Sequence, residues 1–263
     1  MAERLAHLVI VVTGAAGAIG AAIAERLAED GASLVVTDLN GDTLPGLCAS
    51  LERAGAARAI PVAADLSIEA GAQALRDATL AAFGRCDVLV NNAGGGVIRP
   101  FLEHTPETLK ATIDRNLWTV LWCCRAFLPP MVAAGQGRII NIGADSVRTG
   151  IYSHAGYNAA KGGVNGLTTG LAFEFGPKGI RVNTVSPGGV LTPDLKKLLE
   201  GDAETESRIT LRMNPRDTMV TIPNRRFAEM REVGALVAFL ASDEAAAING
   251  QVYSVNGGQW MMG

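Results

Sequence analysis

A tyrosine and a lysine stand four residues apart at the end of the stretch NIGADSVRTGIYSHAGYNAAK, as Tyr157 and Lys161. Side chains at positions i and i+4 of a helix share a face, so we expect the phenol and the ammonium group to lie close together. An isolated tyrosine, with a pKa of about 10, is a poor base at neutral pH, but a neighbouring positive charge favours the phenolate and lowers that pKa. The pair can therefore take a proton from an alcohol, or return it to an alkoxide.

A glycine-rich turn, TGAAGAIG, lies between an apolar run and a predicted helix near the start of the chain. Gly14, Gly17 and Gly20 allow the backbone to turn tightly and to approach a pyrophosphate at the amino terminus of that helix. Asp38 ends the next apolar run, SLVVTD. A carboxylate there can accept both ribose hydroxyls of NAD and repels the 2′-phosphate of NADP. Because no basic residue follows at Leu39 or at the next position, the pattern predicts NAD as the cofactor.

Short β-branched runs alternate with alanine-rich helical stretches along the chain. The predicted strands are LVIVVTG, SLVVTD, AIPVAAD, CDVLVNNAG, GRIINIG, GIRVNTVSPG and QVYSVNGG, and the predicted helices are IGAAIAERLAEDG, 43–54, 68–83, 105–133, 157–175 and 229–241. The strands are continuously apolar, which indicates that both faces of their sheet are covered. We therefore predict an α/β fold with a doubly wound (Rossmann) parallel seven-stranded sheet and helices on both faces, in a single domain over residues 1–263.

Residues 191–226 break this alternation with an irregular, polar segment near the last strands. Such folds bind ligands at the carboxyl ends of their strands, so a long insertion there predicts a substrate lid. A plain surface loop or an oligomer contact is the alternative interpretation.

Composition excludes several classes of function. The chain is 48% hydrophobic and 19% charged with a formal net charge of −3, which argues against nucleic acid or an anionic membrane as a main partner. The apolar run 8–12 is too short to span a membrane and is predicted to be a buried strand. The four cysteines lack metal-ligand spacing, so we expect reduced cysteines, no metal site and a cytoplasmic location.

Five motifs in this order and spacing resemble the short-chain dehydrogenase/reductase family. They are the glycine-rich TGAAGAIG at 13–20, NNAG at 91–94, Asn116, YxxxK at 157–161 and PGGVLT at 187–192. The resemblance covers nearly the whole chain. It implies a homo-oligomer, a tetramer or a dimer, that pairs the fourth and fifth helices across a two-fold axis.

The same resemblance implies roles for individual residues. Lys161 would bind the nicotinamide ribose, Asn116 would hold a water that links Lys161 to solvent, Asp65 would contact the adenine amino group, and Thr192 would hold the carboxamide. The predicted cofactor-binding residues are Gly14, Gly17, Ala18, Ile19, Gly20, Asp38, Leu39, Asp65, Leu66, Asn91, Asn92, Ala93, Gly94, Tyr157, Lys161, Pro187, Gly188, Val190 and Thr192.

The chain departs from the family at one catalytic position. The family serine that holds the substrate oxygen typically stands thirteen residues before the tyrosine, where this chain has Ala144. Losing one such donor costs about 10²–10³ in rate if nothing replaces it. We predict that Ser146 takes its place. Asp145, Ser153 and His154 are further candidates, and a water or a second substrate hydroxyl is the alternative.

Three stretches, LWCCRAFLPPM, RTGIY and KGGVNGLTTGLAFE, are similar to cis-dihydrodiol carboxylate dehydrogenases. A carboxylate substrate needs a cation, and Arg99, Arg148 and Arg212 lie in segments that could reach the site. The predicted function is an NAD-dependent oxidoreductase that transfers hydride between NAD and a secondary alcohol, such as a cyclic diol or hydroxy acid. An NAD-binding regulator or scaffold without efficient turnover, a ketoreductase working in reverse, and an NADPH-dependent reductase are the alternatives.

Overall fold

Seven parallel strands form one twisted sheet in the computed structural model, which describes residues 4–202, 204–205 and 214–261. The strand order is β3-β2-β1-β4-β5-β6-β7. The strands are β1 (Val9–Thr13), β2 (Ser33–Asp38), β3 (Arg58–Ala63), β4 (Val88–Asn91), β5 (Gly137–Ile142), β6 (Ile180–Pro187) and β7 (Val252–Val255). The predicted doubly wound fold is confirmed.

The strand order reverses between β1 and β4, which lie side by side with Ile10 opposite Val88. Doubly wound sheets bind ligands outside the carboxyl ends of their strands at such a reversal. Every residue of β1 and β4 is buried, as the continuous apolar runs predicted. The edge strands β3 and β7 are more exposed, because each has a neighbouring strand on one side alone.

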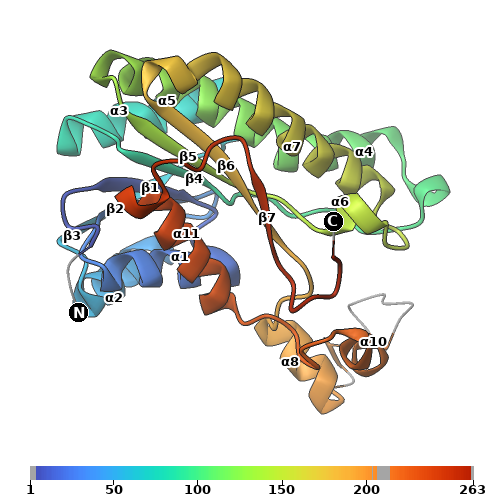
Figure 1. Cartoon of the computed structure of the whole chain (residues 1–263). Helices are drawn as coiled ribbons and strands as arrows, with labels where there is room; N and C mark the ends of the chain where they lie inside the picture. Colours follow the sequence, from blue (N-terminus) through green and yellow to red (C-terminus); the bar gives the residue numbers. More distant parts are fainter. Residues whose placement is uncertain (1–3, 203, 206–213, 262–263) are drawn as a thin grey trace.

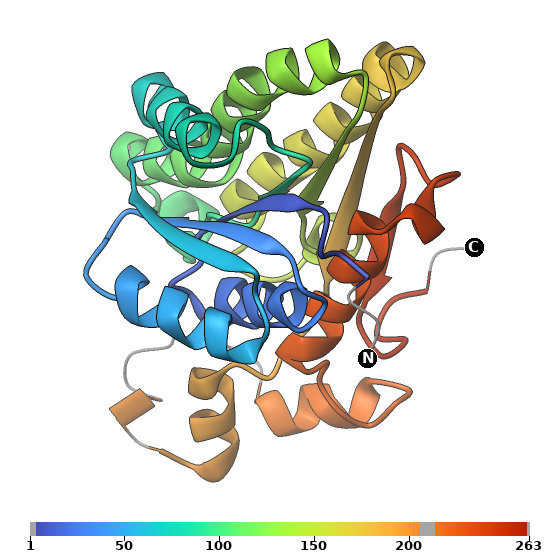
Figure 2. The ribbon, with the colours of Figure 1, turned by 90° about the vertical axis from the view of Figure 1, so that its left-hand side faces the viewer.

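Helices cover both faces of the sheet, as Figures 1 and 2 show. One face is covered by α1 (Ala18–Glu29), α2 (Leu44–Ala54) and α11 (Met230–Ala241), and the other by α3 (Glu69–Phe83), α5 (Thr119–Ala134) and α7 (Ala155–Phe175). Each layer has its own apolar core. Ile23 and Val237 lie in the first core, and Leu75 and Phe127 lie in the second.

The predicted helix over 105–133 is interrupted. Thr105 caps α4 (Pro106–Ile113) by accepting a hydrogen bond from the Thr108 amide, which confirms the predicted start. A π-helical turn, Asp114–Trp118, then leads into α5, so the prediction of one continuous α-helix was wrong in its middle. Among the described residues, the helical stretch 106–134 is the one long and apolar enough to cross a membrane. Its apolar side chains include Phe127, which is fully buried against the sheet.

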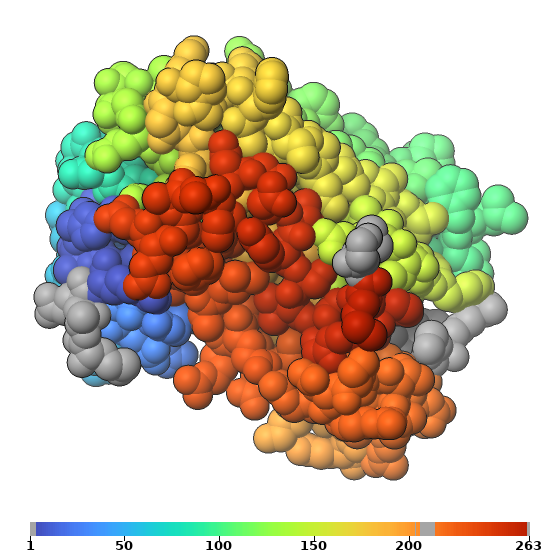
Figure 3. Space-filling model, in the orientation of Figure 1, coloured from blue at the N-terminus to red at the C-terminus, as the bar shows by residue number. Residues whose placement is uncertain are grey.

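Residues 191–226 contain two short helices in the part that the structure describes, α8 (Pro193–Glu200) and α10 (Pro215–Thr221). They lie beside each other below the sheet in Figure 1, and residues around α10 form a projection at the lower edge of Figure 3. Both ends of the segment are tied together, because Val190 bridges Ala228 and the Leu191 amide donates to the Ala228 carbonyl at 2.8 Å. The expectation of an irregular segment was therefore too simple. Its role as a lid stays a prediction.

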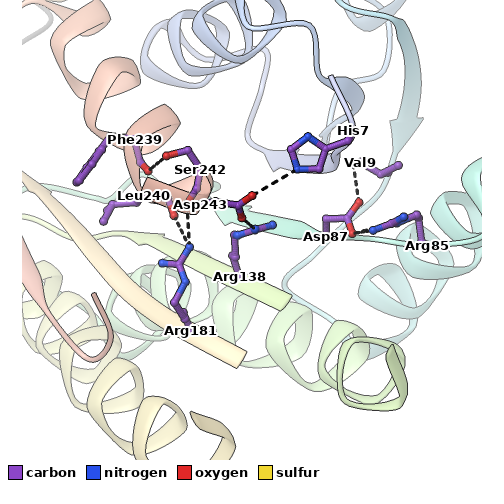
Figure 4. A network of polar contacts seen from close by, with 10 residues as sticks. All are labelled: His7, Val9, Arg85, Asp87, Arg138, Arg181, Phe239, Leu240, Ser242 and Asp243. Carbon is purple, nitrogen blue, oxygen red and sulfur yellow. Dashed lines mark hydrogen bonds and ion pairs between the residues drawn. The ribbon is translucent and has the colours of Figure 1, made fainter. Parts of the chain in front are cut away.

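Polar contacts hold the amino ends of the strands together, at the edge of the sheet away from the ligand-binding edge (Figure 4). The buried carboxylate of Asp87 accepts hydrogen bonds from the Val9 amide at 2.8 Å and from Arg85 Nε at 2.9 Å. Arg138 pairs with Asp243, and Arg181 donates to the Leu240 carbonyl at 3.0 Å. These contacts tie β1, β4, β5 and β6 to their flanking segments.

Candidate active site

Tyr157 and Lys161 lie on one face of α7, as their spacing predicted. The Lys161 ammonium is 5.8 Å from the centre of the Tyr157 ring and donates to the Ile142 carbonyl at 2.8 Å. Ile142 ends β5, so the lysine is held at the carboxyl edge of the sheet. Lys161 is buried and Tyr157 is partly buried.

Burial controls the titration of both groups. It raises the pKa of Tyr157 to about 12 and lowers the pKa of Lys161 to about 8. In the protein alone the loss of water sets the pKa of Tyr157, and the lowering expected from the ammonium together with the positive nicotinamide ring stays a prediction. As the pH rises, Lys161 therefore loses its proton first, near pH 8.

Asn116 lies in the π-helical turn and is fully buried. Its side-chain nitrogen donates to the carbonyls of Gly95 and Thr112, each at 2.9 Å, and its oxygen accepts from the Gly95 amide at 3.1 Å. A Cβ added to Gly94 would lie 2.7 Å from the Asn116 oxygen and 3.5 Å from the Lys161 ammonium. The structure thus brings together Asn116, Lys161 and the NNAG segment. The predicted water between Asn116 and Lys161 stays a prediction.

The glycine turn after β1 has the shape that a pyrophosphate needs. Gly14 has a φ of +63°, and a Cβ at Gly20 would lie 2.1 Å from the Gly14 carbonyl oxygen. Larger residues at these positions would clash with the backbone or strain it. The loop is braced from the end of β4, because the Asn92 side-chain nitrogen donates to the carbonyls of Thr13 and Gly14, each at 3.0 Å. The Ala93 amide donates to the Thr13 hydroxyl at 2.9 Å.

Asp38 ends β2 beside this turn. Its carboxylate accepts from the Ala16 amide at 3.1 Å and from the Leu39 amide at 2.8 Å. The Ala16 bond holds the acid next to the glycine turn, where the ribose of a dinucleotide would lie. The residues present therefore fit NAD. Gly17, Ala18 and Ile19 belong to the same turn and the start of α1.

The other predicted cofactor residues follow the carboxyl ends of the strands but differ in what their side chains do. Asp65 is exposed and accepts hydrogen bonds from Ser67, while the next side chain, Leu66, is buried in the core. Asn91 is also directed into the core, where it donates to the Asn141 oxygen at 2.9 Å. Neither Leu66 nor Asn91 thus directs its side chain at the expected ligand.

The residues after β6 lie at the same edge of the sheet. Pro187 ends the strand, and the Gly188 amide donates to the Val255 carbonyl at 3.1 Å. Val190 is buried beside Ala228. The Thr192 hydroxyl accepts from the Leu195 amide at 3.3 Å, which caps α8 and leaves the hydroxyl proton for another acceptor.

The loop after β5 offers no hydroxyl at position 144, where buried Ala144 stands. The Ser146 hydroxyl donates to the Asn158 side-chain oxygen at 2.6 Å, and must leave that acceptor if it is to donate to a substrate. Asp145 is fully buried and accepts from Ser254 at 2.8 Å and Asn256 at 2.6 Å, which ties this loop to β7. The Asp145 carboxylate is therefore occupied by these two donors and does not replace the hydroxyl that is missing at position 144.

Among the arginines proposed to bind a carboxylate, Arg148 is engaged elsewhere. Its guanidinium donates to the Ser254 hydroxyl at 2.9 Å and to the Val252 carbonyl at 3.0 Å, and it must leave these partners if it is to bind a substrate carboxylate. Arg99 makes one long contact of 3.4 Å with the Glu103 carbonyl. Its loop borders Tyr157, because a Cβ at Gly96 would lie 3.3 Å from the Tyr157 ring. Arg212 lies outside the described residues.

Comparison with known proteins identifies the family. A family model described as Enoyl-(Acyl carrier protein) reductase matches residues 14–259. A 2,3-dihydroxy-2,3-dihydro-p-cumate dehydrogenase from Pseudomonas putida is 53% identical over 254 residues, which cover 97% of this chain and 95% of the relative. The chain belongs to the short-chain dehydrogenase/reductase family. A 1,6-dihydroxycyclohexa-2,4-diene-1-carboxylate dehydrogenase from Acinetobacter baylyi is 38% identical, with 97% of both chains covered.

Solved structures of this family agree with the fold. Levodione reductase has a TM-score of 0.88 at 32% identity and covers 97% of this chain and 98% of its own. NAD⁺-bound xylitol dehydrogenase has a TM-score of 0.88 at 27% identity, with 97% of this chain and 99% of its own covered. Together with the site geometry, these findings make the chain an NAD-dependent dehydrogenase that acts on CH–OH groups.

Proposed function

We propose that this enzyme oxidises a vicinal cis-diol on a cyclohexadiene ring that also carries a carboxylate. The observation that carries this proposal is the 53% identity, over almost the whole chain, to a dehydrogenase named for such a substrate. The 38% identity to a second dehydrogenase named for a cyclohexadiene diol carboxylate supports the same class. Oxidation is the proposed direction, and reduction of a ketone is its reverse.

The catalytic steps follow from the positions of Tyr157, Lys161 and Asn116. Tyr157 takes the proton of the substrate hydroxyl as the carbon–oxygen double bond forms, while the proton that the phenol already carries passes to the deprotonated Lys161 amine. NAD, when bound, supplies the acceptor for the hydride that leaves the same carbon. Lys161 lies beside the Tyr157 ring, and Asn116 lies beside Lys161, so the proton has a path from the phenol away from the substrate.

We further propose that the Ser146 hydroxyl leaves Asn158 and donates to the reacting oxygen, and that Arg99 binds the carboxylate. The loop of Arg99 borders Tyr157, and Ser146 lies on the loop that follows β5. Residues 191–226 would cover the bound substrate, because the segment is anchored beside the carboxyl end of β6.

We also propose a homotetramer in the cytoplasm. The rings of Trp118 and Trp122 stack with centres 5.0 Å apart, and Trp118 is 40% exposed on the helix that the family pairs between subunits. Light scattering of the purified protein tests the oligomer.

The substrate class is tested by the rate of NAD reduction with matched substrates. The panel consists of cis-dihydrodiol carboxylates, the same rings without the carboxylate, linear polyols and simple secondary alcohols. We expect the highest kcat/KM with the cis-dihydrodiol carboxylates, and a loss of about 10–10²-fold when the carboxylate is removed, since one charged hydrogen bond is lost. Equal values across the panel would contradict the proposal.

A further inference from the structure

A strained turn precedes the catalytic helix. Ser153 has a φ of +66°, one of two non-glycine residues with positive φ among the described residues. The His154 amide closes the turn by donating to the Ile151 carbonyl at 3.1 Å. Positive φ is unfavourable for serine, and such backbone strain is concentrated at functional sites. The turn fixes where His154 stands relative to Tyr157.

His154 occupies the N-cap position of α7, but its side chain makes no capping hydrogen bond. Serine, threonine, asparagine and aspartate are the residues that stabilise this position. A histidine there contributes no cap, and a residue that breaks a local preference without a structural gain is a candidate for function.

The tautomer of His154 follows from its one polar contact. Nδ1 lies 2.8 Å from the Tyr152 carbonyl oxygen, and a carbonyl oxygen only accepts hydrogen bonds. Nδ1 therefore carries the proton, and Nε2 of the neutral ring is an acceptor. The ring is partly buried and lies edge-on to the Tyr157 ring, with centres 6.0 Å apart and planes at 85°.

We propose that His154 is a substrate-binding residue that accepts a hydrogen bond from the hydroxyl next to the one being oxidised. The inference rests on the proposed diol substrate. A vicinal diol presents two hydroxyls to two neighbouring side chains, so Tyr157 takes the proton of one while Nε2 of His154 accepts from the other. A mono-alcohol leaves Nε2 without this partner, and a site built to bind a hydroxyl discriminates against substrates that lack it. His154 thus selects diols over mono-alcohols.

The test compares a cis-dihydrodiol with the matching ring that carries a single hydroxyl, in the full-length enzyme with NAD. His154→Ala should lower the ratio of kcat/KM for diol over mono-alcohol by at least about tenfold, because one hydrogen bond is lost with the diol alone. His154→Gln places an acceptor oxygen near the former Nε2 and should restore part of that ratio. His7→Ala, an exposed histidine at the opposite edge of the sheet, is the matched control and should leave the ratio unchanged.

The outcomes separate the inference from the proposed function. A wild-type enzyme that oxidises diols, with a ratio that His154→Ala leaves unchanged, overturns the role of His154 alone. An equal loss with both substrates, unrelieved in His154→Gln, means that the ring is structural and also overturns it. A wild-type enzyme that does not favour the diol overturns both proposals.

Discussion

At the scale of single residues, Tyr157 and Lys161 lie beside each other on α7 and burial shifts the pKa of both. Burial disfavours the charged form of each, so it moves the pKa of Tyr157 up and that of Lys161 down. Lys161 has the lower pKa, about 8, so it loses its proton before Tyr157 does. Above that pH Lys161 is deprotonated, so the two groups together can accept the proton of the alcohol.

The pH dependence of oxidation follows from this titration. We expect kcat/KM for alcohol oxidation to rise with pH and to level off above about pH 8, since the form with one proton fewer takes up the substrate proton. Ketone reduction should show the opposite trend. Measuring kcat/KM against pH in both directions tests this. Lys161→Met should lose the change in kcat/KM near pH 8. Oxidation that is independent of pH between about 6 and 10 would contradict the role of the pair.

We expect Asp38 to set the choice of cofactor. Asp38→Ser removes the charge that repels a 2′-phosphate, so the preference for NAD over NADP should fall by about 10²-fold, since like charges in a site cost several kcal/mol. The ratio of kcat/KM for the two cofactors measures the change. Asp42→Ser, an exposed acid in the following loop, is the control and should keep the wild-type ratio. Unaltered preference in Asp38→Ser would show that another feature selects NAD.

Ser146 and Ala144 give a direct test of the substrate-oxygen contact. Ser146→Ala should lower turnover by at least about tenfold if its hydroxyl donates to the reacting oxygen. Asn158 is then the hydrogen-bond partner of that hydroxyl when no substrate is bound. Steady-state kinetics of Ser146→Ala and Ala144→Ser measure the effect. Unchanged turnover in Ser146→Ala, or a large gain in Ala144→Ser, would contradict the proposed role of Ser146.

The positions of Tyr157, Lys161 and Asp38 could be predicted from the sequence, because the place of each side chain is set by spacing within one helix or at the end of one strand. The partners of Ser146 and Arg148 could not, since a side chain's partner depends on tertiary packing. Arg148 binds Ser254, which is 106 positions away. The same limit applies to Asp145, whose partners lie on and just after β7.

At the scale of elements, all seven strands and the main helices could be predicted from apolar runs and their caps. The π-helical turn at 114–118 could not, because an apolar period of 3.6 residues continues on both sides of it. This turn brings Asn116 to Gly95, and such insertions are frequent at functional sites. The exposure of β3 and β7 depends on strand order, which spacing along the chain does not determine.

Asp87 provides the test at this scale, because it ties β1 to β4 through a buried carboxylate. Asp87→Ala leaves the Val9 amide without its acceptor and should lower the free energy of unfolding by about 2–3 kcal/mol. Urea denaturation measures the loss. Asp77→Ala breaks an exposed pair with Arg76 and should stay within about 0.5 kcal/mol of wild type. Equal effects of the two substitutions would show that the buried contact is not stabilising.

At the scale of the whole molecule, the candidate catalytic groups and the glycine turn come from segments spread over most of the chain and meet at one edge of the sheet. The segment 191–226 is the part that the sequence described least well. Its helices nevertheless carry signals, since Thr192 and Asn214 act as N-caps and each is followed by proline. Short helices with such caps fall below the length at which an apolar period is visible.

The central claim is that Tyr157 takes the proton in an NAD-dependent oxidation of a cyclic diol. Its most direct measurement is the turnover of NAD with a cis-dihydrodiol carboxylate by wild-type enzyme and by Tyr157→Phe, with NAD affinity determined for both. We expect the variant to bind NAD normally and to lose about 10²–10⁴-fold in kcat, because it removes the general base. A variant that turns over the diol at the wild-type rate would contradict the claim.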